Sequence, residues 1–143
     1  MPLPERLEAG TVGVPGIIAL HEGIKHLLFY GKDNVTEKCS YLERRLTNAL
    51  SQMENVTVYA KTQNKVSTVL FNINGISSES VAMLLSEKGI CVRAGLHCAP
   101  LCHKALGTLE SGAVRASLSH FNTGEEIDVF LKEVENISKR KEP

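Results

Sequence analysis

The sequence predicts a two-layer α+β sandwich, in which a small sheet of three or four mostly antiparallel strands is covered by helices. Segments with apolar residues at helical spacing alternate along the chain with short runs rich in β-branched residues. At 143 residues, with 43% hydrophobic and 22% charged residues, the chain can bury one ordinary core. We expect residues 33–143 to form this small domain and residues 1–32 to supply an N-terminal segment with a long linking helix.

Two helices open the predicted order. The first covers residues 17–29, follows Pro15-Gly16 and ends before Gly31, a residue type that favours helix C-termini. Asp33 can cap the second helix. Apolar side chains recur at three- and four-residue steps in both helices: Ile17, Leu20, Ile24, Leu27 and Leu28 in the first, and Val35, Cys39, Leu42, Leu46, Leu50 and Met53 in the second.

A hairpin and a third helix follow. Residues 56–60 and 66–73 are rich in β-branched and aromatic residues and predict two strands joined by a polar turn. Ser77 or Ser78 can cap the helix that comes next, and Gly89 can end it.

Two short strands and a last helix complete the predicted domain. The strands are expected at residues 90–94 and 113–118. Thr123 and Glu126 have the spacing of a capping box, in which each side chain accepts a hydrogen bond from the other residue's backbone. The helix that they open has one apolar face, made of Ile127, Phe130, Leu131, Val134 and Ile137.

The segment 93–100, Arg-Ala-Gly-Leu-His-Cys-Ala-Pro, is the most informative part of the chain. Cys98 follows a glycine-containing turn, beside His97 and within reach of Arg93. A free thiol titrates near pH ~8.5, and cationic neighbours lower its pKa, so this segment suits a reactive thiolate. Because function concentrates in loops, we predict that Cys98 is a nucleophile.

Arg115 lies inside an otherwise apolar, strand-like run. A buried arginine is rare without an anionic partner, and its planar fork matches a carboxylate. The alternative is an arginine on the exposed side of an edge strand. Together, Cys98 and Arg115 point to chemistry on a small, amino-acid-like substrate.

The other possible ligands have simpler explanations. Cys39 lies on the inward face of a helix and Cys91 within a predicted strand, so both are expected in the core. Four residues of metal-ligand type crowd into one short segment: His97, Cys98, Cys102 and His103. Structural zinc sites commonly use two spaced pairs instead, so we expect no metal site.

Charge and cysteine usage exclude several classes. Lysine plus arginine equals aspartate plus glutamate, 16 each, so we expect no binding to nucleic acid or to a membrane. No apolar run is long enough to span a bilayer, and the first residues do not have the pattern of a secretory signal. The four cysteines then predict reduced thiols in a cytoplasmic protein.

Three segments of the chain, taken in this order, resemble the C-terminal part of cysteine desulfurases in the class V aminotransferase family: RLEAGT (6–11), RAGLHCAP (93–100) and VRASLSHFNT (114–123). These are pyridoxal-phosphate enzymes of fold-type I. The resemblance runs from about Arg6 to the last helix. One departure is Leu96, where the better-known members have a histidine.

The resemblance implies a pyridoxal-phosphate cofactor, whose Schiff-base lysine precedes the EAGT segment in a large domain. We therefore expect the cofactor domain to be absent from this chain, and the isolated chain to be inactive. Thr11, with Gly10, matches the threonine that reaches the cofactor phosphate of the neighbouring subunit, which implies a homodimer. From pattern alone, Thr11 is only a turn residue.

The resemblance also implies roles for the two chemical segments. Arg115 would bind the α-carboxylate of L-cysteine, with Arg93 as a weaker candidate. Cys98 would take the sulfur as a persulfide and leave alanine, and His97 would deprotonate or position the thiol. A sulfur-acceptor protein would then receive the sulfur.

Three alternatives stay open at this point. The complete enzyme could be a selenocysteine lyase or another class V aminotransferase, because a cysteine cannot choose between sulfur and selenium. The chain could also be a non-catalytic interaction or metal-binding fragment. In the family the first helix packs on the large domain, so we expect Ile17, Ile18 and Leu20 to be exposed and to drive self-association.

Overall fold

The computed structural model describes residues 2–7, 10–59 and 66–139. The chain divides into two compact units, Met1–Val35 and Thr36–Pro143. The first unit holds a 3₁₀ turn, η1 (Glu5–Leu7), the helix α1 (Val14–Tyr30) and the start of α2 (Lys32–Ser51). The second unit holds the rest of α2 and all the later elements: β1 (Val56–Tyr59), β2 (Thr68–Ile73), α3 (Ser78–Ser86), α4 (Pro100–Leu106), β3 (Val114–Ser117) and α5 (Gly124–Ser138).

Helix α1 has an apolar surface that nothing in the described chain buries. Ile17, Ile18 and Leu20 are 55%, 58% and 65% exposed, as the sequence predicts. Gly31, at φ +81°, ends the helix, and its N–H donates to the Leu27 carbonyl at 2.9 Å. Self-association through this surface remains a prediction. None of the helices in the described ranges has both the length and the apolarity needed to cross a bilayer.

Helix α2 begins at Lys32, two residues before the start that an Asp33 cap would give. Asp33 therefore lies in its first turn instead of capping it, where a carboxylate still suits the positive end of the helix dipole. The predicted inward positions Leu42, Leu46 and Leu50 are fully buried, whereas Cys39 is only half-buried. Three buried positions of this helix thus anchor the core of the second unit.

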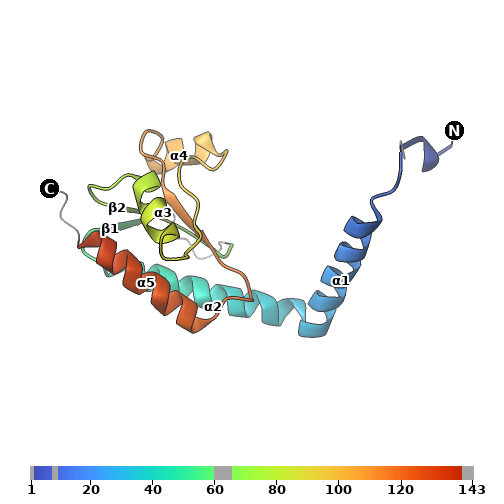
Figure 1. Ribbon diagram of the computed structural model, residues 1–143, viewed down its shortest axis with the longest axis horizontal. Helices are drawn as coiled ribbons and strands as arrows, with labels where there is room; N and C mark the ends of the chain where they lie inside the picture. Colours follow the sequence, from blue (N-terminus) through green and yellow to red (C-terminus); the bar gives the residue numbers. More distant parts are fainter. Residues whose placement is uncertain (1, 8–9, 60–65, 140–143) are drawn as a thin grey trace. The chain divides into compact units, whose positions relative to one another are not determined.

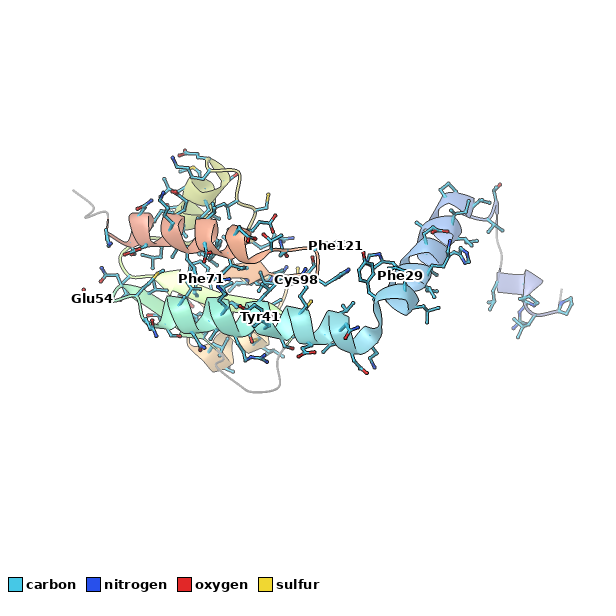
Figure 2. The ribbon with its side chains drawn as sticks, turned by 90° about the horizontal axis from the view of Figure 1, so that it is seen from below. Phe29, Tyr41, Glu54, Phe71, Cys98 and Phe121 are labelled. Atoms are coloured by element: carbon cyan, nitrogen blue, oxygen red, sulfur yellow. The ribbon has the colours of Figure 1, made fainter. Side chains whose placement is uncertain are left out.

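The sheet has the order β1-β2-β3, with both pairs antiparallel. Burial alternates along β2, so that Val69, Phe71 and Ile73 face the core and the residues between them face the other side. Helices α2 and α5 run side by side beneath the core face, as Figures 1 and 2 show. The Phe71 ring meets the Phe130 ring of α5 edge to face, with centroids 5.9 Å apart. The predicted α+β class with a small antiparallel sheet is confirmed.

The fourth predicted strand, residues 90–94, is reduced to one antiparallel bridge between Arg93 and Arg115. The polar turn expected at residues 61–65 lies outside the described residues. Strand β3 is therefore paired with β2 along its length and with a second segment only near Arg115. This arrangement leaves the Arg93–Arg115 pair at the boundary between the sheet and the cysteine loop.

Helix caps were the most predictable local features. The Thr123 hydroxyl accepts from the Glu126 N–H at 3.3 Å, and the Glu126 carboxylate accepts from the Thr123 N–H at 3.1 Å, which confirms the capping box. The Glu126 carboxylate also accepts a hydrogen bond from the Asn122 side chain. This bond first, and then the one from the Thr123 backbone, lowers the pKa of Glu126. Ser77, not Ser78, caps α3, and this helix ends at Ser86, before Gly89.

One helix was missed. Helix α4 lies at residues where the sequence predicts a loop. Pro100 stands in its first turn, where the missing N–H of proline costs nothing, and Gly107 ends it in the left-handed conformation at φ +71°. The short helix matters because it begins two residues after Cys98 and carries His103.

Candidate functional site

The Cys98 segment is an exposed, tightly turned loop between the Arg93 bridge and helix α4. The Ala99 N–H donates to the Leu96 carbonyl at 2.8 Å and closes a turn around His97 and Cys98. Both of these residues have left-handed backbones, at φ +52° and +58°. Non-glycine residues adopt this conformation rarely, and consecutive ones are held there only by their surroundings. The turn exposes the Cys98 side chain.

The loop lies directly against the residue that leads into β3. Gly112 has φ +60°, and a Cβ built on it would lie 2.8 Å from the Gly95 Cα, closer than side chains tolerate. The Ala113 N–H donates to the Gly95 carbonyl at 3.2 Å. A glycine is therefore required at position 112, because the backbone of the cysteine loop passes where a side chain would stand.

His97 is fixed as one tautomer by its backbone partner. Its Nε2 lies 3.1 Å from the Ala113 carbonyl oxygen. A carbonyl only accepts, so Nε2 carries the proton and Nδ1 is the basic nitrogen of the neutral ring. Nδ1 is buried and has no hydrogen-bond partner among the described residues. The structure thus provides a neutral imidazole with a free lone pair in the cysteine loop.

Burial is the main cause that lowers the pKa of His97. The hydrogen bond to the Ala113 carbonyl acts in the opposite direction, and the positive charges of Arg115, His103 and Arg93 lower the pKa further. A lowered pKa keeps the ring neutral at pH 7, which is the state in which Nδ1 can accept a proton.

Arg93 and Arg115 form a pair of like charges on one face of the sheet. The Arg93 N–H donates to the Arg115 carbonyl at 3.1 Å, and the Arg115 N–H donates back at 2.7 Å. Residues that exchange both bonds stand directly opposite each other, and their side chains share a face. Within the described chain, neither guanidinium has an ion-pair partner.

Arg115 is half-buried, and its Nε is buried with no hydrogen-bond partner in the described chain. Strand β3 is the outer strand of the sheet, but Arg115 pairs with Leu70 of β2 on one side and with Arg93 on the other, so the edge is covered at this position. Like charges placed opposite each other repel, and an orphaned buried N–H costs free energy. A small carboxylate between the two guanidinium groups would relieve both penalties.

Thr11 and Gly10 belong to the first unit. Both are exposed, Gly10 has φ +123°, and Thr11 has no hydrogen-bond partner within the described ranges. A free hydroxyl next to backbone N–H groups fits an anionic group such as a phosphate. The two preceding residues of the EAGT segment lie outside the described residues.

The remaining cysteines and histidines do not assemble into a metal site. No group of three potential metal ligands occurs among the residues that the structure describes. His103 is buried and hydrogen-bonded to Thr108, and Cys102 is exposed on α4. The prediction that Cys91 lies in the core is wrong. Cys91 is exposed, because residues 90–92 do not pair with β3 and only Arg93 does.

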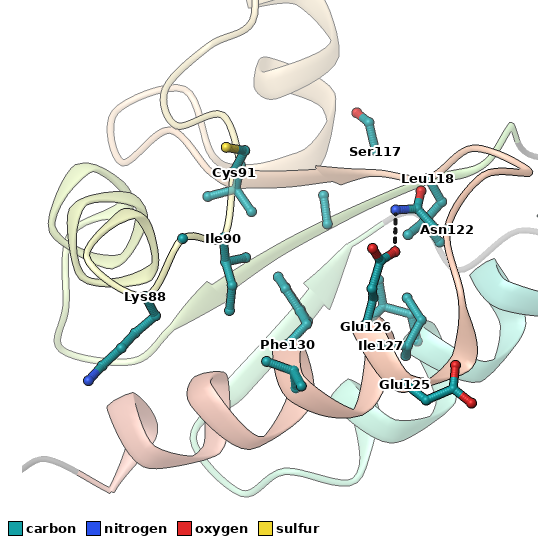
Figure 3. Close-up of a pocket in the computed structure, with 15 residues that line it drawn as sticks. Lys88, Ile90, Cys91, Ser117, Leu118, Asn122, Glu125, Glu126, Ile127 and Phe130 are labelled. Atoms are coloured by element: carbon teal, nitrogen blue, oxygen red, sulfur yellow. Dashed lines mark hydrogen bonds between the residues drawn. The ribbon is translucent and has the colours of Figure 1, made fainter.

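A cavity of about 490 Å³ lies between the segment 88–92, the end of β3 and helix α5 (Figure 3). Its walls include Ile90, Cys91, Ser117 and Phe130. None of Cys98, His97, Arg93 and Arg115 lines it. The cavity opens on the helix-covered side of the sheet, where Ala116 and Phe130 lie, whereas Arg115 alternates onto the other side. The four predicted site residues therefore lie outside this cavity.

The second unit is an α+β domain with a small antiparallel sheet, and its cysteine loop stands beside an arginine pair. The family model for aminotransferase class-V matches residues 1–130. The chain belongs to the aminotransferase class-V family.

Relatives and solved structures agree with this assignment. The probable cysteine desulfurase of Methanothermobacter thermautotrophicus is 34% identical over 94% of this chain and 34% of its own length. That of Pyrococcus abyssi is 36% identical over 95% of this chain and 34% of its own length. The apo cysteine desulfurase from Thermococcus onnurineus NA1 is 36% identical, covers 95% of this chain and 34% of that one, and has a TM-score of 0.87.

The cysteine desulfurase CsdA of Escherichia coli, solved in its S-sulfonic acid form, is 29% identical with a TM-score of 0.84 over 95% of this chain and 33% of that one. The chain thus spans about a third of the length of the relatives that it matches. It corresponds to one part of a larger enzyme in those proteins.

The sequence predicts Cys98, His97, Arg93 and Arg115 as site residues, and the structure brings them close to one another: Arg93 bridges Arg115, and His97, next to Cys98, contacts Ala113 just before β3. Thr11 and Gly10 lie in the other unit. The buried pair His103 and Thr108 was missed. No spacing signal marks this pair, because it depends on a short helix that the sequence reading did not predict.

Proposed function

We propose that residues 33–143 are the small domain, and residues 1–32 the linking segment, of a pyridoxal-phosphate-dependent cysteine desulfurase that converts L-cysteine to alanine and a protein persulfide. The observation that carries the proposal is that Arg93 and Arg115 stand opposite each other without an anionic partner in the described chain, beside an exposed cysteine in a strained turn. The relatives that are cysteine desulfurases support the choice of reaction.

The arginines bind and orient the substrate. Arg115, with its buried and unpartnered Nε, grips the α-carboxylate, and Arg93 adds charge from the same face. A substrate fixed by its carboxylate has its sulfur restricted to a small region near the loop. Positioning of this kind converts the encounter with Cys98 into an effectively intramolecular step.

Cys98 accepts the sulfur. Its thiolate attacks the substrate sulfur, an S–S bond forms and the C–S bond of the substrate breaks. Pyridoxal phosphate, which Thr11 and Gly10 would help to hold, would supply an electron sink for the pair that the substrate carbon retains. After that carbon gains a proton, alanine leaves, and Cys98 holds the sulfur as a persulfide. Cysteine and thiol are thus converted to alanine and persulfide with no external oxidant.

His97 supplies the proton acceptor for this step. Its Nδ1 is neutral, buried and free of other partners, so it can take the thiol proton before the attack. Its Nε2 is occupied by the Ala113 carbonyl and cannot serve. This bond ties His97 to the residue before β3, the strand that carries Arg115. It therefore fixes the position of the base relative to the carboxylate-binding arginine.

The cofactor and the partners complete the proposal. Thr11 and Gly10 contribute donors to the cofactor phosphate across a homodimer interface, and a sulfur-acceptor protein removes the persulfide sulfur. The Schiff-base lysine belongs to the large domain, so the 143-residue chain alone should release no sulfide from L-cysteine.

The test uses the full-length enzyme that contains this segment. Cys98→Ser should abolish alanine release from L-cysteine, whereas Cys91→Ser, a matched change at another exposed thiol, should leave it intact. Alanine release that survives Cys98→Ser would contradict the proposal. Faster turnover of selenocysteine, in the Cys98→Ser variant as well, would instead favour a selenocysteine lyase.

A further inference from the structure

The buried pair His103 and Thr108 has no role in the proposed reaction. His103, on α4, is 1% exposed, and its Nδ1 lies 2.8 Å from the Oγ1 of Thr108, which is 2% exposed. The Thr108 N–H also donates to the His103 carbonyl at 2.8 Å. A buried imidazole costs free energy unless it is hydrogen-bonded, and an aliphatic side chain would fill the same space without that cost. The pair therefore needs a reason beyond filling the core.

The His103 ring contacts the ring of His97. Their centroids are 5.4 Å apart, with the planes tilted by 46°. At its other end His97 is held by the Ala113 carbonyl. The His97 ring is thus fixed at two places, by a hydrogen bond to the start of β3 and by packing on His103. Since the Thr108 hydroxyl fixes the orientation of His103, the Thr108 side chain influences His97 through one intermediate ring.

The turn that this ring belongs to needs outside support. His97 and Cys98 both have left-handed backbones, which surrounding contacts must enforce. The backbone contribution comes from the Ala99 N–H, which donates to Leu96, and from the His103 N–H, which donates to the Ala99 carbonyl at 3.1 Å. His103 therefore meets the turn twice, through its backbone at Ala99 and through its ring at His97.

We propose that His103, oriented by Thr108, is a positioning residue that holds the His97 ring and thereby the left-handed turn that presents Cys98. Burial is the largest cause of the lowered pKa of His97, and Arg115, His103 and Arg93 also lower it. What the turn contributes to sulfur transfer rests on the proposed function. The positioning itself does not, and it can be tested on the chain without any activity.

The test measures hydrogen exchange of the Ala99 amide, which closes the turn, against that of the Phe71 amide in the fully buried central strand. Thr108→Val removes only the side-chain hydrogen bonds, the one with His103 Nδ1 and the longer one, 3.5 Å, to the His103 carbonyl, because the backbone bonds of Thr108 remain. Thr108→Ser restores the hydroxyl. His103→Asn keeps a side-chain donor for Thr108 but removes the ring from His97. Thr57→Val, the same chemical change at an exposed position of β1, is the matched control.

We expect Thr108→Val and His103→Asn to reduce Ala99 protection by about threefold to tenfold relative to Phe71, the range of one lost hydrogen bond or contact. Thr108→Ser and Thr57→Val should leave it unchanged. In Thr108→Val, the pKa of His97, followed by NMR, should rise toward its ordinary value. The proposal is overturned if Ala99 protection is unchanged in both variants. It is also overturned if Ala99 and Phe71 lose protection equally, since His103 would then only fill the core.

Discussion

Removal of the Arg115 guanidinium tests how the substrate carboxylate is held. Arg115→Ala in the full-length enzyme leaves a carboxylate beside Arg93 alone, and Arg93 is exposed whereas Arg115 is half-buried. A charge-assisted hydrogen bond contributes about 1.5–3 kcal/mol, and loss of one partner of a desolvated charge pair costs about 2–5 kcal/mol. The remaining charge of Arg93 offsets part of this. We therefore expect a loss of about 2–4 kcal/mol in kcat/KM for L-cysteine, roughly 30-fold to 900-fold.

Steady-state kinetics of alanine release against L-cysteine concentration measure this loss. Arg115→Lys should recover only part of it, because an ammonium cannot donate to both carboxylate oxygens in one plane. Arg93→Ala should cost less than Arg115→Ala, because its side chain is already in solvent. Unchanged kinetics in Arg115→Ala would refute the reasoning, because the substrate carboxylate would then be bound by Arg93 or by the large domain.

Three further predictions concern the 143-residue chain itself. Cys98, which is exposed, should be alkylated faster at neutral pH than half-buried Cys39, as mass spectrometry at limiting reagent would show; earlier labelling of Cys39 would argue against the loop assignment. Thr123→Ala should lower the free energy of unfolding in urea by about 1 kcal/mol, and Thr123→Ser should restore most of it; equal stabilities would mean that the capping box contributes nothing. His97 has a lowered pKa when folded, so the unfolded chain binds more protons below pH ~6.5. Its contribution to stability is complete above that pH and is lost as the pH falls toward the lowered folded value. The wild type should therefore lose more unfolding free energy than His97→Gln between pH ~7.5 and pH ~5.5, and parallel losses would contradict this.

Local signals in the sequence were sufficient for most of the fold. The capping box at Thr123 and the helical spacing of Leu42, Leu46 and Leu50 act between neighbours along the chain, so residue types alone reveal them. The strand expected at residues 90–94 failed for a tertiary reason. This segment pairs with β3 only at Arg93, whereas residues 90–92, which precede it, border the cavity beside α5.

The site shows the same division. Cys98 and Arg115 could be selected from the chemistry of their side chains in a loop and in an apolar run. The antiparallel bridge that brings Arg93 opposite Arg115 depends on register between distant segments. The tautomer of His97 depends on the Ala113 carbonyl. The burial of His103 depends on how α4 packs, although Pro100 and Gly107 are local signals for the helix itself. None of these three features is encoded at short range.

The most direct test of the central claim is to find where the substrate sulfur goes. The full-length enzyme is mixed with a limiting amount of L-cysteine, its thiols are trapped by alkylation, and the peptides that carry Cys91, Cys98 and Cys102 are identified by mass spectrometry. We predict that one additional sulfur atom appears on Cys98, in proportion to the alanine formed, and that the other exposed cysteines stay unmodified. Alanine formed without extra sulfur on Cys98, or with the sulfur first on Cys91, would contradict the account.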